Sequence, residues 1–131
     1  MSDVWLHSLS VWGLGFTISC AIGHVAVAKF HRWLTHRLGV PRDLGARRTP
    51  LWLTGFLERV FFTLAVAVNT TGVLPAIIAW LALKLAANWQ NRDDIDGDAE
   101  TKKNYKFSAI VTGLLSMLFA YIGGLVIWRW S

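Results

Sequence analysis

Four long apolar runs dominate this sequence of 131 residues. A helix that crosses a bilayer needs about 20 mostly apolar residues, because the hydrocarbon core is about 30 Å thick and each helical residue rises about 1.5 Å. The runs, which reach or approach that length, lie at about 9–30, 51–68, 72–89 and 107–128. Only 16% of the residues are charged, against about one quarter in a soluble domain. The sequence therefore predicts an all-α integral membrane protein, in which a bundle of four transmembrane helices forms a single domain.

Lysine and arginine are distributed unevenly between the two ends of that bundle. Ten of them lie in the connecting loops at about 31–50 and 90–106 or next to them, whereas only Arg129 lies at the opposite end. The positive-inside rule places both loops in the cytoplasm and both termini outside. A tight polar turn at 69–72 joins the second and third helices on the outer side. We expect a multi-pass protein of the bacterial inner (cytoplasmic) membrane.

Three charged residues, Glu58, Arg59 and Lys84, lie inside the predicted spans. An ionised group near the bilayer centre costs about 2.5–3.5 kcal/mol on insertion scales, so each needs a partner, a wet cavity or a route to the interface. The side chain of Lys84 can extend to the headgroups, as that of Arg59 partly can, but Glu58 is too short. The third helix runs antiparallel to the second, and His24 lies at a similar depth in the first. We therefore predict an intramembrane polar cluster of Glu58, Lys84, His24 and Arg59, with a Glu58–Lys84 ion pair and His24 beside it.

This cluster has more than one interpretation. A neutralised Glu58–Lys84 pair can simply fix the register of two helices. A functional pair would serve as a proton relay or line a path for an ion or a headgroup. In a third arrangement Glu58 pairs with arginines at the interface, although Arg59 itself points about 100° away on a helix and is not its natural partner.

Small residues recur at four-residue spacing in two of the runs. Inside lipid, helices associate through close packing of small residues rather than through the hydrophobic effect. We predict helix-contact faces, within the chain or between subunits, at Gly15, Ser19 and Gly23 of the first run and at Ser116, Ala120 and Gly124 of the fourth.

The first loop mixes basic with apolar residues, as in a short interfacial helix that contacts anionic headgroups. The basic residues concerned are Arg32, Arg37, Arg42, Arg47 and Arg48. Membrane topology alone explains much of this charge, and binding of an anionic lipid or of a lipid-linked phosphate is the more specific alternative.

The second loop is acidic, and its Asp93, Asp96 and Asp98 are weak candidates for a metal site. As an EF-hand, this loop would begin at Arg92 and end at Lys103, neither of which binds calcium. A solvated loop whose carboxylates balance nearby lysines is the simpler interpretation, with a weak Mg²⁺ or Ca²⁺ site as the alternative. The sequence contains no complete set of metal ligands, so we predict no cofactor.

Two classes of function remain. The first is a non-enzymatic permeation or transport unit, or an accessory subunit of a membrane complex, that forms a homo-oligomer and contacts anionic lipid headgroups at the cytoplasmic face. The alternative is a cytoplasmic-face enzyme acting on a lipid phosphate, or an effector that responds to anionic lipid. The sequence offers no nucleophile–base arrangement, which makes an enzyme the weaker hypothesis. The net charge of +5 does not indicate nucleic-acid binding, because the basic residues share the chain with long apolar runs.

Overall fold

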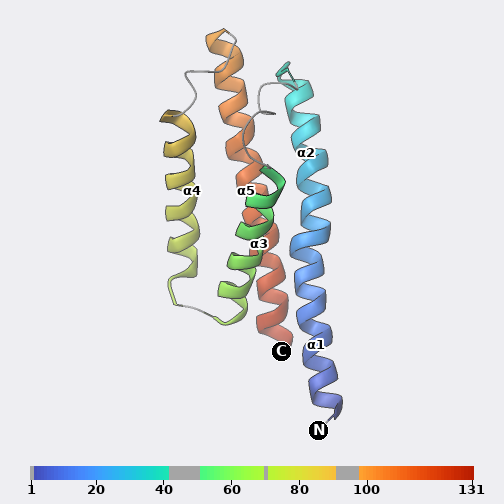
Figure 1. Cartoon of the computed structure of the whole chain (residues 1–131). Coiled ribbons are helices and arrows are strands. Elements are labelled where there is room, and N and C mark those ends of the chain that lie inside the picture. Colours follow the sequence, from blue (N-terminus) through green and yellow to red (C-terminus); the bar gives the residue numbers. More distant parts are fainter. Residues whose placement is uncertain (1, 42–50, 70, 91–97) are drawn as a thin grey trace.

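The computed structural model describes residues 2–41, 51–69, 71–90 and 98–131, and all regular secondary structure in them is helical. The elements are α1 (Ser2–Phe16), the π-helical segment η1 (Thr17–Ile22), α2 (Gly23–Arg37), α3 (Leu51–Ala67), α4 (Val73–Gln90) and α5 (Ala99–Trp130). Because α1, η1 and α2 form one continuous rod, the described chain contains four helices (Figure 1). The prediction of an all-α protein with four helices is confirmed at this level.

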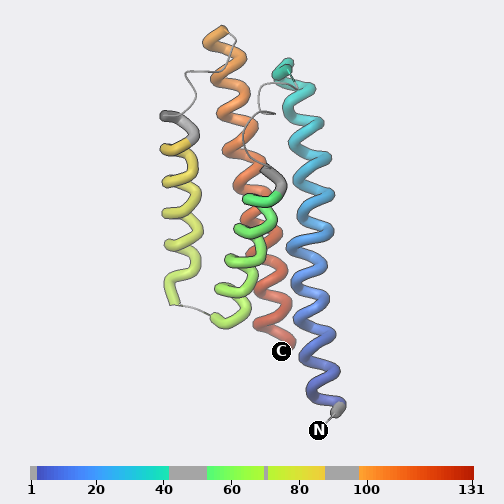
Figure 2. Tube along the Cα trace, viewed as in Figure 1, coloured from blue at the N-terminus to red at the C-terminus, as the bar shows by residue number. Residues whose placement is uncertain are grey.

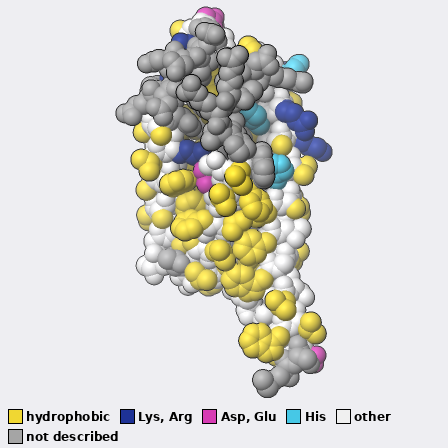
Figure 3. Space-filling model, in the orientation of Figure 1, with side chains coloured by type: hydrophobic (Ala, Val, Ile, Leu, Met, Phe, Trp, Pro, Cys, Tyr) yellow, Lys and Arg dark blue, Asp and Glu magenta, His cyan; other side chains and the backbone are white. Residues whose placement is uncertain are grey.

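Two of these helices, Asp3–Arg37 and Ala99–Trp130, are long and apolar enough to cross a membrane. α3 and α4 have 17 and 18 residues. At about 1.5 Å per residue they span about 26 and 27 Å, slightly less than a hydrocarbon core. Large apolar side chains are exposed on all four helices, for example at Leu9, Phe61, Ile78 and Leu114. On the face drawn in Figure 3, hydrophobic side chains cover the middle and lower parts, and Lys, Arg and His side chains lie in the upper part.

Both long helices extend beyond the spans predicted from the apolar runs. The first continues through residues 31–37, and the last begins at Ala99 instead of near residue 107. Residues 31–37 of the first loop thus form the end of α2 and not a separate interfacial helix, whereas 42–50 lie outside the described residues. An apolar-run criterion stops at the first charged cluster, whereas Lys, Arg and Glu favour helix and let it continue with a polar face. Asp98 fixes the start of α5, since its Oδ1 accepts a hydrogen bond from the Thr101 backbone N–H at 2.9 Å.

Successive helices run in opposite directions, so the chain termini and the α3–α4 turn lie at one end of the bundle (Figure 1). We call this the terminus end, and the opposite end, where α2 and α4 finish and α5 begins, the loop end (Figure 2). The turn uses left-handed backbone at Asn69 (φ 51°) and Gly72 (φ 85°), which Gly adopts without strain and Asn tolerates. α3 begins below the loop-end tips of α2, α4 and α5 (Figure 1).

Toward the terminus end, the first helix, α3 and α5 pack closely through small residues. A Cβ added at Gly15 would lie 2.7 Å from the carbonyl oxygen of Gly123, so the backbones of α1 and α5 nearly touch. A Cβ added at Gly124 would lie 2.9 Å from the carbonyl oxygen of Thr63, so α3 approaches α5 equally closely. Thr63 and Ser19 are fully buried, and Thr63 Oγ1 donates a hydrogen bond to Ser19 Oγ at 2.7 Å. One polar contact thus joins α3 to η1 inside this packing.

The remaining residues of the two predicted contact faces also lie at helix contacts within the chain. A Cβ at Gly23 would lie 3.0 Å from Phe119 Cβ on α5. Ala120 is fully buried, and its carbonyl oxygen lies 3.3 Å from the Thr63 hydroxyl. Ser116 accepts a hydrogen bond from α3. The face of the first helix therefore packs on α5, and the face of α5 packs on α3.

Candidate functional site

A cavity of about 610 Å³, open along part of its surface, lies among α2, α3, α4 and α5 in the half of the bundle nearer the loop end. Its lining mixes charged, hydroxyl, imidazole and apolar side chains. The polar residues that line it are His24, His31, Thr54, Glu58, Arg59, Lys84, Tyr105, Thr112 and Ser116, and the apolar ones include Val27, Trp80, Leu83 and Ala109. The predicted polar cluster therefore lies on the wall of a cavity.

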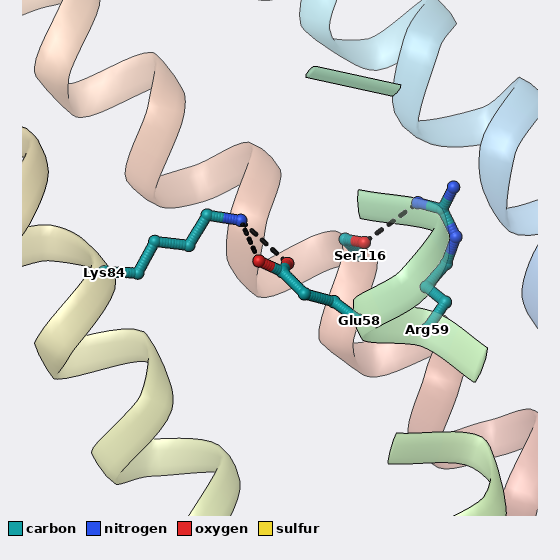
Figure 4. A network of polar contacts seen from close by, with 4 residues as sticks. All are labelled: Glu58, Arg59, Lys84 and Ser116. Atoms are coloured by element: carbon teal, nitrogen blue, oxygen red, sulfur yellow. Dashed lines mark hydrogen bonds and ion pairs between the residues drawn. The ribbon is translucent and has the colours of Figure 1, made fainter. Parts of the chain in front are cut away.

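Glu58 and Lys84 form a bidentate ion pair across the cavity wall. Lys84 Nζ on α4 donates to both carboxylate oxygens of Glu58 on α3, at 2.8 and 2.7 Å (Figure 4). The side chain of Glu58 is 6% exposed and that of Lys84 34% exposed. The structure thus brings together the two residues that the antiparallel spans suggested, with the Glu58 side chain buried and the Lys84 side chain partly exposed.

Arg59 extends from α3 away from Glu58, on the other side of the helix (Figure 4). Its residue exposure is 2%, so the side chain points into the bundle instead of reaching toward an interface as the sequence suggested. Nη1 donates to Ser116 Oγ on α5 at 3.0 Å, and Nη2 lies 3.4 Å from His24 Nδ1 on α2. Since a guanidinium only donates, Nδ1 is the acceptor in this contact. His24 therefore joins the cluster through Arg59 and not through the ion pair.

The positive charge of Arg59 has only neutral hydrogen-bond partners. Among the described residues, Glu58 pairs with Lys84, and no carboxylate lies within ion-pair distance of the Arg59 guanidinium. Arg59 Nε is buried and also lacks a partner among the described residues. Because Glu58 and Lys84 cancel, the described lining carries one net positive charge when its histidines are neutral.

Sequence reasoning missed the polar face that α5 presents to this cavity. His31 Nδ1 lies 3.2 Å from Thr112 Oγ1, which joins α2 to α5 a few residues from the Arg59–Ser116 contact. Tyr105 is buried at the same wall. A signal for this face exists, since Tyr105, Thr112 and Ser116 are seven and four residues apart, which places them on one side of α5.

The basic and acidic loop candidates lie elsewhere. Arg32 and Arg37 are exposed on α2 and do not line the cavity. Arg32 Nε donates to its own helix at the Ala28 carbonyl (3.4 Å), and the Arg37 guanidinium lies 5.8 Å from the centre of the Trp33 ring, a cation–π distance. The other three predicted headgroup ligands, Arg42, Arg47 and Arg48, lie outside the described residues.

Of the weak metal candidates, only Asp98 belongs to the described part of the chain, and Asp93 and Asp96 lie outside it. Asp98 caps α5, and the hydrogen bond from Thr101 holds the pKa of its carboxyl below the usual value. Among the residues that the structure describes, no group of three His, Cys, Asp or Glu side chains is arranged to hold a metal ion.

Comparison with known proteins identifies no relative of this chain. No family model, no curated protein and no solved structure matches the chain. What the chain does therefore has to follow from the geometry and the charge of its cavity.

Proposed function

We propose that this chain spans a membrane with its four helices and acts as a non-enzymatic permeation or transport unit, within a homo-oligomer or a larger membrane complex. One observation carries the proposal, namely a cavity of about 610 Å³ lined by charged side chains inside an apolar bundle. An ion pair that only fixed helix register would be stabilised by dry, close packing. A cavity beside it supports a path or a binding chamber for a solute.

Two features support the membrane part of this proposal. Exposed large apolar side chains occur on every helix of the described structure, whereas a soluble monomer keeps its largest exposed apolar patch to about 300–600 Å². Basic residues of the described chain gather at the loop end, with Lys29, Arg32 and Arg37 on the first helix and Lys102 and Lys103 at the start of α5. Under the positive-inside rule, the loop end then faces the cytoplasm.

Cysteine labelling tests the membrane topology. In a Cys20→Ser background, Lys103→Cys and Ser131→Cys place one thiol at each end of the bundle, both at exposed positions. A membrane-impermeant maleimide added to intact cells is expected to label position 131 and to label position 103 only after permeabilisation. Labelling of both positions in intact cells, or release of the protein from membranes by alkaline carbonate, contradicts the proposal.

Osmotic swelling of proteoliposomes tests transport without a prior choice of solute. After a hyperosmotic step with sorbitol, with choline thiocyanate, or with potassium benzoate and valinomycin, so that a permeant counter-ion balances the charge of each salt, liposomes that contain the protein are expected to swell faster than empty ones for at least one solute. Glu58→Gln should change that rate at least about threefold, equivalent to about 0.6 kcal/mol, because it removes a charge from the cavity wall.

Asp98→Asn is the matched control, since it makes the same carboxylate-to-amide change at an exposed helix cap outside the cavity. It should leave the swelling rate unchanged. Equal effects of the two substitutions, or swelling no faster than that of empty liposomes for every solute, contradict a transport role for the cavity.

A further inference from the structure

We propose that the cavity binds an amphipathic anion, with Arg59 holding its carboxylate or phosphate group and the apolar wall contacting its body. This inference rests on the proposed function, because it assigns a cargo to the same cavity. It begins from Arg59, which is 2% exposed and has no carboxylate partner in the described structure. A buried cation without a counter-charge is costly, and an anion that enters the cavity supplies one.

The hydrogen-bonding capacity of Arg59 is only partly used. A guanidinium has five N–H donors in a planar fork that matches a carboxylate or phosphate. In the described structure two of them are engaged, one by Ser116 Oγ and one by His24 Nδ1, and both partners are neutral. Nε has no partner among the residues that the structure describes. Donors therefore remain for an oxyanion, and the two neutral partners orient the fork from α5 and α2.

The second cation on the wall does not offer an equally free site. Lys84 already donates to both oxygens of Glu58, so an incoming anion must compete with that carboxylate. Glu58 in turn is neutralised, which leaves no free negative charge on the described lining to attract a cation. The cavity is thus selective for negative charge, and Glu58 limits how strongly it binds an anion.

The rest of the lining indicates an apolar body on the ligand. Trp80, Leu83 and Ala87 on α4 and Ala109 on α5 line the same cavity as Arg59. The volume of about 610 Å³ is within the range of about 300–1,000 Å³ that is typical of small-molecule sites. A bare inorganic ion would leave this apolar surface in contact with water, so we expect it to bind more weakly than an amphiphile of the same charge.

Calorimetry on the full chain in phosphatidylcholine nanodiscs tests the charge selectivity. Benzoate, benzyl alcohol and benzyltrimethylammonium share an aromatic body and carry negative, zero and positive charge, and inorganic phosphate carries charge without that body. Benzoate should bind at least about tenfold more tightly than the other three, as a charge-assisted hydrogen bond requires. Equal binding of benzoate and benzyl alcohol overturns the proposal.

Three substitutions assign the site to Arg59. Arg59→Met should weaken benzoate binding at least about tenfold, whereas Arg59→Lys keeps the preference for benzoate over benzyl alcohol. Arg129→Met, an equal loss of charge at an exposed position near the opposite end, should have no effect. Wild-type affinity in Arg59→Met overturns the assignment.

Glu58→Gln guards against a trivial loss of binding through misfolding. It frees Lys84 and removes the competing carboxylate, so benzoate should bind about three- to tenfold more tightly. Because an unfolded protein cannot gain affinity, this result cannot come from damage to the fold. Unchanged or weaker binding in a Glu58→Gln protein that keeps wild-type helicity by circular dichroism overturns the proposal.

The source of the anion is distinguished by a second set of nanodiscs that contain phosphatidylglycerol, in buffer of high ionic strength to screen the surface potential. Weaker benzoate binding there identifies a lipid headgroup as the occupant, and equal binding identifies a soluble amphiphile; both support the anion site. Benzoate binding without solute flux keeps the anion site and contradicts the transport function. Solute flux without any preference for benzoate keeps the transport function and contradicts the anion site.

Discussion

The two halves of this bundle are packed in opposite ways. Toward the terminus end, the first helix and α3 approach α5 so closely at Gly15, Gly123 and Gly124 that a Cβ would strike the neighbouring helix. Toward the loop end, α2, α3, α4 and α5 surround a cavity of about 610 Å³ and are bridged by long side chains such as Arg59 and Lys84. The same helix, α5, lines both halves.

Side-chain size explains this difference. α5 presents Ala120, Gly123 and Gly124 to the close-packed half and Tyr105 and Thr112 to the cavity. Inside a bilayer the hydrophobic effect does not hold helices together, so close contact between their backbones stabilises the bundle. Helices that surround a polar cavity lack that stabilising contact. We infer that the terminus half holds the helices together and that the loop half carries the ligand chemistry. Substitutions can test this division.

The largest effect is expected at Gly124. Its replacement by Val adds three carbon atoms where a Cβ would already lie 2.9 Å from the Thr63 carbonyl oxygen. The neighbouring backbone cannot yield as a flexible side chain would, so Gly124→Val should lower the free energy of unfolding by about 3 kcal/mol. Thermal or SDS-induced unfolding in mixed micelles, followed by circular dichroism, measures this change.

Gly13 offers the matched control. A Cβ at Gly13 would meet nothing within 4 Å, so Gly13→Val should change the same free energy by less than about 1 kcal/mol. Similar losses at Gly13 and Gly124 would show that the close-packed half does not depend on small residues.

A smaller effect is expected in the cavity half, at the Glu58–Lys84 pair. Lys84→Met leaves the carboxylate of Glu58, whose side chain is 6% exposed, without its partner and should cost about 2 kcal/mol. The double substitution with Glu58→Gln should cost at least about 1 kcal/mol less than the two single changes added together. Unfolding of the four proteins under identical conditions gives this coupling energy. Strict additivity would mean that the pair contributes no stability, so that both halves depend on packing alone.

The helices were predictable because each apolar run carries its own length signal, but their ends were not. The basic residues of 31–37 and the lysines of 102–106 mark the limits of an apolar run and not of a helix. Whether α3 and α4 cross a membrane does not follow from their length either, because each is shorter than about 20 residues.

The part of the candidate site that could be predicted is the part whose residues are identified by their charge alone. Glu58 and Lys84 are conspicuous in an apolar sequence, and antiparallel neighbours bring them together. The burial of Arg59 depends on which way α3 faces, and a chain without an amphipathic pattern does not encode that locally. The role of Ser116 was hidden as well, because the same small side chain suits both helix packing and a hydrogen bond to Arg59.

The smallest effect is expected beyond both halves, at the first turn of α5. Hydrogen bonding by Thr101, first through its side chain and then through its backbone N–H, lowers the pKa of Asp98 below its usual value of 3.8. The cap therefore adds stability that is fully present above that value and is lost as the pH falls through the lower pKa of the folded state. We expect the Thr101 amide proton, followed by NMR from about pH 6 to about pH 2, to shift with a midpoint below 3.8. Asp98→Asn keeps the hydrogen-bond acceptor and should abolish that pH-dependent shift without changing benzoate binding. A midpoint at or above 3.8 would contradict the cap. An altered benzoate affinity would extend the ligand site beyond the cavity half.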